Sequence, residues 1–161
     1  MYVTIIQSTL GIFHLSVYPL RSKSMNTKIL FVEDDKEVVE TVLLIFNYHW
    51  PEATVVHSFL GKPAIELVKR ENPDAIILDL GLPDISGFEV MRNVRLFSSV
   101  PIIVLTAHSA EDEIVKALEE EATDYVTKPF RHRELLARVQ AHVNRWKMNE
   151  IRSIVQRQIT G

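Results

Sequence analysis

The stretch Ala75-Ile76-Ile77-Leu78-Asp79-Leu80-Gly81 is a short apolar run that ends in an acid and then in a loop. An apolar run of this length with adjacent isoleucines predicts a buried strand. A charge at the end of such a strand has no packing role there. Asp79 is therefore the first candidate functional residue, and the strand before it sets the fold.

Three other apolar runs end in residues of matching chemistry. They are residues 29–32 before Glu33 and Asp34, residues 101–105 before Thr106 and Ala107, and residues 125–127 before Lys128. In an open parallel sheet the carboxyl ends of the strands share one edge, so these groups would converge on a single crevice. Acids, a hydroxyl group and an ammonium group would meet there.

The periodicity of the chain alternates between strands and helices. The predicted strands are residues 28–33, 53–57, 74–79, 101–106 and 123–127. The predicted helices are residues 35–48, 62–71, 86–97, 111–121 and 131–147 or longer. Five successive strand and helix units predict an α/β fold, in which helices cover both faces of a parallel sheet.

The composition suits one globular domain with tails, because the 161 residues are 47% hydrophobic and 24% charged. Eighteen basic and 21 acidic residues give a net charge of −3, which argues against direct binding of nucleic acid. The absence of cysteine excludes disulfides, thiol nucleophiles and sulfur-ligated metals. It agrees with a cytoplasmic location.

Residues 1–25 differ from the rest and are expected to form a poorly ordered extension. Polar residues and Pro19 interrupt their apolar pattern, which is too short and too polar to predict a membrane span. A secretory signal would carry a basic residue ahead of the apolar stretch, but the first one here is Arg21. A signal or anchor remains the alternative, and Met25, just before the first predicted strand, is an alternative start.

From about Met25 to Trp146 the chain resembles the receiver domain of two-component response regulators. That family has a flavodoxin-like, doubly wound fold, so the resemblance implies five parallel strands in the order 2-1-3-4-5. It also implies a receiver domain at residues 26–147, followed by a helical extension or linker at residues 148–161.

The resemblance assigns roles to individual residues. It implies that Asp79 accepts a phosphoryl group from the phosphohistidine of a sensor histidine kinase or phosphotransfer protein, and that the chain is not an enzyme in the ordinary sense. The other matched positions are the acidic pair Glu33 and Asp34, the switch hydroxyl Thr106, the lysine Lys128 and the aromatic switch position Tyr125.

Physical chemistry supports a metal site beside Asp79. Three carboxylates this close would repel one another unless a cation bridged them, and oxygen ligands suit Mg²⁺ or Mn²⁺. The expected shell is Glu33, acting through water, with Asp34, Asp79 and the backbone carbonyl of Gly81. Asp35 lies where a helix cap falls, and we leave it out of this shell.

The phosphoryl oxygens need partners as well. Lys128 would supply a fixed positive charge, and its peptide bond to Pro129 is expected to be cis. Thr106 would donate its hydroxyl group, and the small Ala107 would leave room for the phosphate. His108 is expected in a solvent-facing loop, where it could tune how fast the acyl phosphate hydrolyses.

Phosphorylation is expected to act by a population shift, in which Thr106 moves toward the phosphate and Tyr125 turns into the vacated space. The face formed by residues 111–147 would then change its affinity for a downstream output domain or protein, or for a second copy of the chain. Glu119-Glu120-Glu121 departs from the family, which usually has a glycine after one or two acids. Dimerisation through this face is therefore open.

Fifteen residues follow Trp146, too few for an output domain, and we expect none in this chain. An apolar pattern runs on through Met148, Ile151, Ile154 and Val155. The interpretations left open are a linker, a coiled-coil dimer seam, a docking helix and a frayed tail.

Three other functions fit these residues less well than phosphoacceptance does. An aspartate-nucleophile phosphatase generally places a second acid two residues after the nucleophile, where this chain has Gly81. A flavin-binding module would hold phosphate after the first strand, where three acids stand here. A non-phosphorylated interaction domain would not need the complete set of acids, hydroxyl group and lysine.

Overall fold

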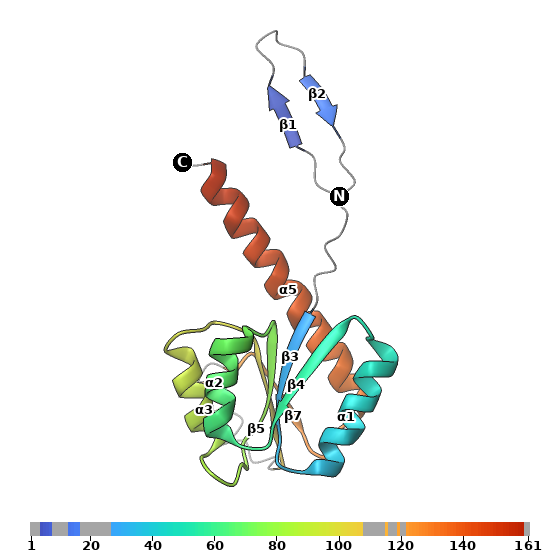
Figure 1. Cartoon of the computed structure of the whole chain (residues 1–161), viewed down its shortest axis with the longest axis vertical. Coiled ribbons are helices and arrows are strands. Elements are labelled where there is room, and N and C mark those ends of the chain that lie inside the picture. The colour runs from blue at the N-terminus through green and yellow to red at the C-terminus, as the bar shows by residue number, and fades with distance from the viewer. Residues whose placement is uncertain are drawn as a thin grey trace.

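The computed structural model of the chain describes residues 4–7, 13–16, 27–107, 115, 119 and 122–159. A five-stranded parallel sheet forms its centre (Figure 1). Its strands are β3 (Thr27–Val32), β4 (Ala53–Ser58), β5 (Ala75–Asp79), β6 (Ile102–Thr106) and β7 (Asp124–Thr127). Their spatial order is β4-β3-β5-β6-β7, which confirms the predicted order 2-1-3-4-5.

Helices cover both faces of this sheet, as predicted. They are α1 (Lys36–His49), α2 (Gly61–Glu71), α3 (Gly87–Arg95) and α5 (His132–Ile159). Figure 1 shows α2 and α3 on one side of the sheet and α1 and α5 on the other. The predicted helix over residues 111–121 falls mostly outside the described residues, of which Val115 and Glu119 are helical.

Alternation along the buried strands builds two hydrophobic cores, because successive side chains of a strand point to opposite faces. In β5, Ile77 belongs to the core under α1 and α5, and Leu78 belongs to the core under α2 and α3. Both side chains are fully buried. Each buried aliphatic side chain of this size stabilises the fold by about 1.5–3 kcal/mol.

Local signals fix the helix ends near their predicted positions. The Asp35 carboxylate caps α1 by accepting hydrogen bonds from the backbone N–H groups of Glu37 and Val38, which confirms its predicted role. Ser86 caps α3 in the same way. Asn72 ends α2 with a left-handed backbone, φ 45°. The predicted cis peptide bond between Lys128 and Pro129 is also confirmed.

The amino-terminal extension contains an element that the sequence did not predict. Strands β1 (Thr4–Gln7) and β2 (Phe13–Ser16) pair antiparallel, with Thr4 opposite Ser16, in a two-stranded sheet of their own. They share no ladder with the central sheet. The expectation of a poorly ordered extension did not anticipate this pairing.

The last helix is longer than the core beneath it requires. Helix α5 has 28 residues and reaches twelve residues past the predicted boundary at 147. The Lys147 ammonium group holds it to the domain through Asp74 Oδ2 at 3.3 Å and Thr27 Oγ1 at 2.9 Å. Figure 1 shows the remainder of α5 leaving the sheet. Across the described residues, no helix has both the length and the apolarity to cross a membrane.

Candidate functional site

The candidate site lies at the carboxyl edge of the central sheet. The strand register pairs Val32 with Leu78, Asp79 with Leu105 and Thr106 with Thr127, so the ends of β3, β5, β6 and β7 stand side by side. The Thr106 carbonyl accepts a hydrogen bond of 2.7 Å from the Lys128 backbone N–H and ties the last two ends together. The predicted convergence of strand ends is therefore present.

The pleat distributes the site residues between the two faces of the sheet. Glu33, Asp79 and Lys128 each follow by two positions a residue of the core under α1 and α5. Thr106 follows Val104 by two, and Val104 belongs to the core under α2 and α3. Glu33, Asp79 and Lys128 therefore rise from one face of the sheet and the Thr106 hydroxyl group from the other, on either side of the same edge.

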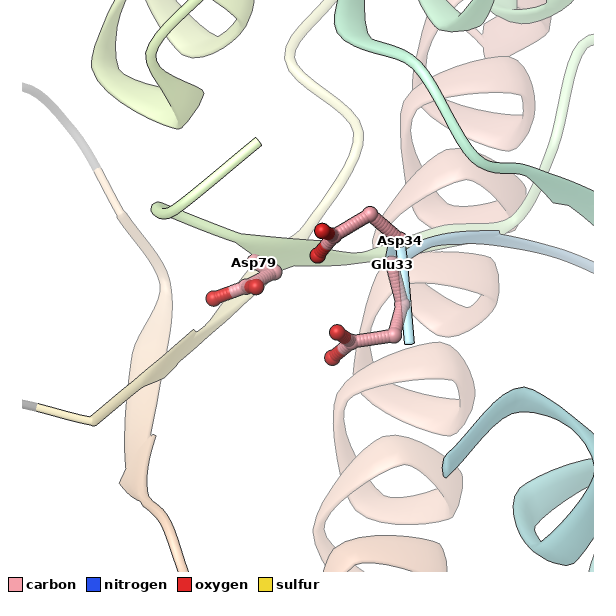
Figure 2. A group of neighbouring side chains, drawn as sticks. All are labelled: Glu33, Asp34 and Asp79. Carbon is pink, nitrogen blue, oxygen red and sulfur yellow. The ribbon is translucent and has the colours of Figure 1, made fainter. Parts of the chain in front are cut away.

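The acidic pair and Asp79 form one cluster. Figure 2 shows the side chains of Glu33, Asp34 and Asp79 pointing into the same space beyond the ends of β3 and β5. One carboxylate oxygen from each lies within 4.8 Å of the others. Glu33 is only 1% exposed and Asp79 only 6%, whereas Asp34 is exposed. Two of the three acids are thus withdrawn from bulk water.

The Lys128 ammonium group bridges the two buried acids. Its Nζ lies 2.7 Å from Glu33 Oε2 and 3.2 Å from Asp79 Oδ2. The sequence placed this lysine near Asp79, but it did not predict the shorter contact to Glu33. That contact joins residues 95 positions apart, and their sequence spacing gave no signal for it.

Burial sets the electrostatics of this cluster. Desolvation raises the pKa of Glu33, and the charge of Asp79 raises it further, against the opposing hydrogen bond from Lys128. Burial also acts to lower the pKa of Lys128, but the hydrogen bond to Glu33 and the charges of Asp79 and Glu33 together raise it. The lysine stays cationic, and among the described residues it is the cation that contacts these acids.

The donor set fits a hard divalent cation. The three carboxylates offer oxygen ligands, and two of them are buried. The single charge of Lys128 does not neutralise all three, so the cluster keeps an excess of negative charge. Mg²⁺ and Mn²⁺ favour carboxylate and carbonyl oxygens together with retained waters. The exposed Asp34 leaves an open side for such waters.

The loop after Asp79 is held close to its carboxylate. The Gly81 backbone N–H donates to Asp79 Oδ1 at 3.3 Å, so Gly81 lies beside the cluster. The metal ligand expected from this residue is its carbonyl, and that role stays a prediction. Sequence reasoning missed Gly87, whose N–H donates to the Leu80 carbonyl at 3.0 Å. A Cβ at position 87 would lie 2.4 Å from the Asp79 carbonyl oxygen, so only glycine permits this close approach.

Asp84 is a second residue that the sequence did not identify. Its carboxylate accepts hydrogen bonds from the backbone N–H groups of Gly61 at 2.7 Å and Lys62 at 2.9 Å. It therefore fastens the Asp79 loop to the first turn of α2. In the sequence, Asp84 is an acid in a turn, and such a residue usually accepts hydrogen bonds from its own turn. The sequence therefore gave no indication of a bond to a helix 22 residues away.

The other predicted residues lie around the rim. Ala107 is exposed directly after Thr106, and Thr106 itself is buried. Tyr125 is half-buried and packs against the core under α2 and α3, the face to which Thr106 also belongs. His108 lies outside the described residues.

Comparisons with known proteins agree on the kind of domain. The family model of the response regulator receiver domain matches residues 29–140. The BeF3-activated N-terminal receiver domain of Klebsiella pneumoniae RstA has 35% sequence identity and a TM-score of 0.68, over 73% of this chain and 98% of that one. The signal receiver domain of a proposed Luxo repressor protein from Vibrio parahaemolyticus has 28% identity and a TM-score of 0.74, over 79% and 97% of the respective chains.

A more distant structure shares the fold. The CheY-like response regulator receiver domain protein from Methanospirillum hungatei JF-1 has 21% identity and a TM-score of 0.70, over 76% of this chain and 98% of that one. Residues 29–140, which the family model matches, include all three acids of the cluster together with Thr106 and Lys128.

Proposed function

The chain belongs to the response regulator receiver domain family, and on that premise we propose that Asp79 accepts a phosphoryl group within a two-component system. The observation that carries the proposal is the Lys128 ammonium group, which contacts both Glu33 and Asp79 beside the exposed Asp34. A buried nucleophilic acid, a fixed cation and an oxygen-rich cluster are the parts that phosphoryl transfer requires.

The transfer step begins at the Asp79 carboxylate. One of its oxygens attacks the phosphorus of a phosphohistidine on a sensor histidine kinase or phosphotransfer protein. The phosphorus–nitrogen bond breaks as the acyl phosphate forms, and the histidine leaves with the electron pair of that bond. We expect this chain to act in the cytoplasm, where the phosphohistidine of such a donor would be accessible to it. The acceptor turns over slowly, by hydrolysis of its own acyl phosphate.

Glu33, Asp34, Asp79 and the Gly81 carbonyl would hold Mg²⁺ or Mn²⁺, with Glu33 acting through water. When bound, the cation supplies positive charge to the phosphoryl oxygens. The burial that raises the pKa of Glu33 supports this assignment, because a nearby cation would stabilise its charged form.

The remaining charge is met by residues of the chain. Lys128 already contacts Asp79 Oδ2 and would contact a phosphoryl oxygen attached to that side chain. Thr106 comes from the opposite face and would donate its hydroxyl group to another phosphoryl oxygen. Ala107 has no side chain beyond Cβ and leaves the approach open.

The switch that we propose joins Thr106 and Tyr125. Thr106 and Tyr125 lie on the same face of the sheet, on the neighbouring strands β6 and β7. A movement of Thr106 toward the phosphoryl group would therefore free space on the face where Tyr125 packs. A cavity of about 460 Å³ lies beside Tyr125, with Phe130 and Arg138 in its wall. This is part of the face of residues 111–147, through which we expect binding of an output domain or protein, or homodimerisation.

The test is the intact mass of the chain after incubation with acetyl phosphate, with and without Mg²⁺. We expect a gain of one phosphoryl group that requires Mg²⁺ and is absent from Asp79→Asn. Asp34→Asn should need a much higher Mg²⁺ concentration for the same gain. An unchanged gain in Asp79→Asn, or no gain in the native chain, would contradict the proposal.

A further inference from the structure

Helix α5 carries a second apolar face that the receiver core does not use. Its core-facing residues are Leu135, Leu136, Val139 and Val143, all buried. Another series recurs at alternating intervals of four and three residues: Ala137, Ala141, Asn144, Met148, Ile151 and Val155. That spacing is the heptad repeat of a helix that packs against another helix. We call these six residues the α5 seam.

The seam lies on the side of α5 opposite the core. All of its members are exposed except Ile151, which is half-buried. Met148 is 52% exposed and Val155 44%, and Ile154 at the border of the seam is 54% exposed. Exposed apolar side chains in one line along a helix mark a binding surface rather than chance exposure. The seam is hard to recognise in the sequence, because the core residues Val139 and Val143 are apolar positions of the same helix.

The flanks of the seam are basic. Residues 144–158 hold four basic side chains, Arg145, Lys147, Arg152 and Arg157, and a single acid, Glu150. Arg145 and Arg152 occupy the position directly after the seam residues Asn144 and Ile151, on one flank. Lys147 stands before Met148 on the other flank and is held by Asp74. Arg157 and Glu150 lie on the far side of the helix.

This charge pattern disfavours a second copy of the chain as the partner. In a parallel pair, the flank of Arg152 would face the flank of Lys147, and in an antiparallel pair Arg145 and Arg152 would face their own equivalents. Either arrangement opposes cations. A partner helix with acidic flanks would instead face these cations with carboxylates.

A membrane surface fits the seam less well. Helices that lie in a lipid interface usually carry aromatic or leucine side chains on the apolar face, and this seam has Met148, Ile151 and Val155. The amino-terminal part of the seam consists of Ala137 and Ala141. These side chains are too small to insert into lipid, but they allow a second helix to approach closely.

We propose that the α5 seam is a docking surface for an amphipathic α-helix with acidic flanks on another protein. Apolar residues of that helix pack on Met148, Ile151 and Val155, and its acids pair with Arg145 and Arg152. Binding at the α5 seam does not depend on phosphorylation of Asp79, so it can be tested separately from phosphoryl transfer.

The probe is a synthetic helical peptide of about three heptads with leucine at the seam positions and glutamate at both flanks, since this is the shortest length that covers the repeat. A matched peptide carries lysine in place of glutamate. Binding of each labelled peptide to the full chain is followed by fluorescence anisotropy. We expect the glutamate peptide to bind at least about tenfold tighter than the lysine peptide, with an affinity that falls as salt is added.

Three variants localise the binding. The double variant Met148→Ser and Val155→Ser should weaken the glutamate peptide about tenfold or more, since two buried apolar contacts are lost. Arg152→Glu should weaken it as well, whereas the matched charge change Arg157→Glu, on the far side of the helix, should have much less effect. Circular dichroism checks that each variant keeps its helix, and acetyl phosphate labelling checks its receiver domain.

Several results would overturn the proposal. One is equal affinity for the two peptides, and another is an affinity unchanged by the double variant. A third is a stable homodimer in sedimentation that the double variant abolishes, which would identify a second copy as the occupant. Tighter binding to phosphatidylglycerol vesicles than to the glutamate peptide would assign the surface to lipid instead.

Discussion

At the scale of single residues, the site works because one ammonium group serves two buried acids. Lys128 Nζ lies 2.7 Å from Glu33 and 3.2 Å from Asp79, and neither acid has much access to water. A buried carboxylate without a partner is costly, so this lysine holds the cluster together before any phosphoryl group arrives. The same charge then lies where negative charge grows during transfer.

Replacement of this lysine should slow phosphorylation, because Lys128 Nζ lies beside the acceptor Asp79. In Lys128→Met, we expect the rate of labelling by acetyl phosphate to fall about 100-fold, since one preorganised charge is lost from the transition state. Intact mass against time measures the rate, and Lys36→Met, at the exposed start of α1, should label like the native chain. A rate for Lys128→Met within a factor of two of the native rate would exclude the proposed role.

A second, half-buried charge cluster should make stability depend on pH. The Asp124 carboxylate lies 3.0 Å from His142 Nε2 and 3.2 Å from Arg138 Nη1, and Arg138 also pairs with Glu134. Burial acts to raise the pKa of Asp124, but the hydrogen bonds from His142, Arg138 and the Tyr125 backbone together hold it below its ordinary value of 3.8. The charged form is therefore favoured by folding.

The direction of the pH dependence of stability follows from the lowered pKa of Asp124. The stabilisation by Asp124 is fully present above its ordinary value of 3.8 and is lost as pH falls through the lower pKa of the folded state. Asp124→Asn should lower the free energy of unfolding by about 1 kcal/mol at pH 5, and this difference should shrink toward pH 2.5. Urea unfolding of both proteins at each pH measures it. A difference that grows on acidification would refute the assignment.

At the scale of elements, the strand ends do the positioning. Each site residue directly ends or follows a buried strand, so the pleat of the sheet decides which way it points. Neighbouring acids can then have unrelated tasks: Asp34 belongs to the carboxylate cluster, whereas Asp35 caps α1 with its Oδ1 at 2.9 Å from the Glu37 N–H.

This division predicts opposite phenotypes for two adjacent substitutions. Asp35→Ala should cost about 1 kcal/mol of stability, since it removes a helix cap. It should leave labelling by acetyl phosphate unchanged. Asp34→Ala should keep the stability and lose most of the Mg²⁺-dependent labelling. Urea unfolding and intact mass, run on both variants, separate the two tasks, and a loss of labelling in Asp35→Ala alone would reverse our assignment.

Elements were predictable to the extent that their signals are local. Apolar runs predicted the five central strands. Asp35, the third acid after the first of these strands, predicted the cap of α1. The contact between Lys128 and Glu33 was not predictable, because it depends on how two distant strand ends pack. The close approach of Gly87 to the Asp79 carbonyl was missed for the same reason. The pairing of β1 with β2 was not predicted, because both strands have only four residues and β1 has two adjacent isoleucines in place of an alternating pattern.

At the scale of the whole molecule, the chain combines a receiver domain with a helix that continues beyond it. The carboxyl edge of the sheet holds the candidate site, and α5 continues past the sheet (Figure 1). This helix carries one apolar face toward the core and another away from it. The sequence indicated that this helix could extend past residue 147, but it could not tell a docking helix from a frayed tail. Only the placement of Val139 and Val143 in the core shows which residues remain for a partner.

The acyl phosphate should form on Asp79. Borohydride reduction of the chain after treatment with acetyl phosphate and Mg²⁺, followed by peptide mass mapping, tests this position. Reduction converts a phosphorylated aspartate into homoserine, so the modified position can be assigned by fragmentation. We predict conversion at Asp79 alone. Conversion at Asp34 or Asp35 with Asp79 intact, or no conversion in a chain that has gained a phosphoryl group, would contradict the account.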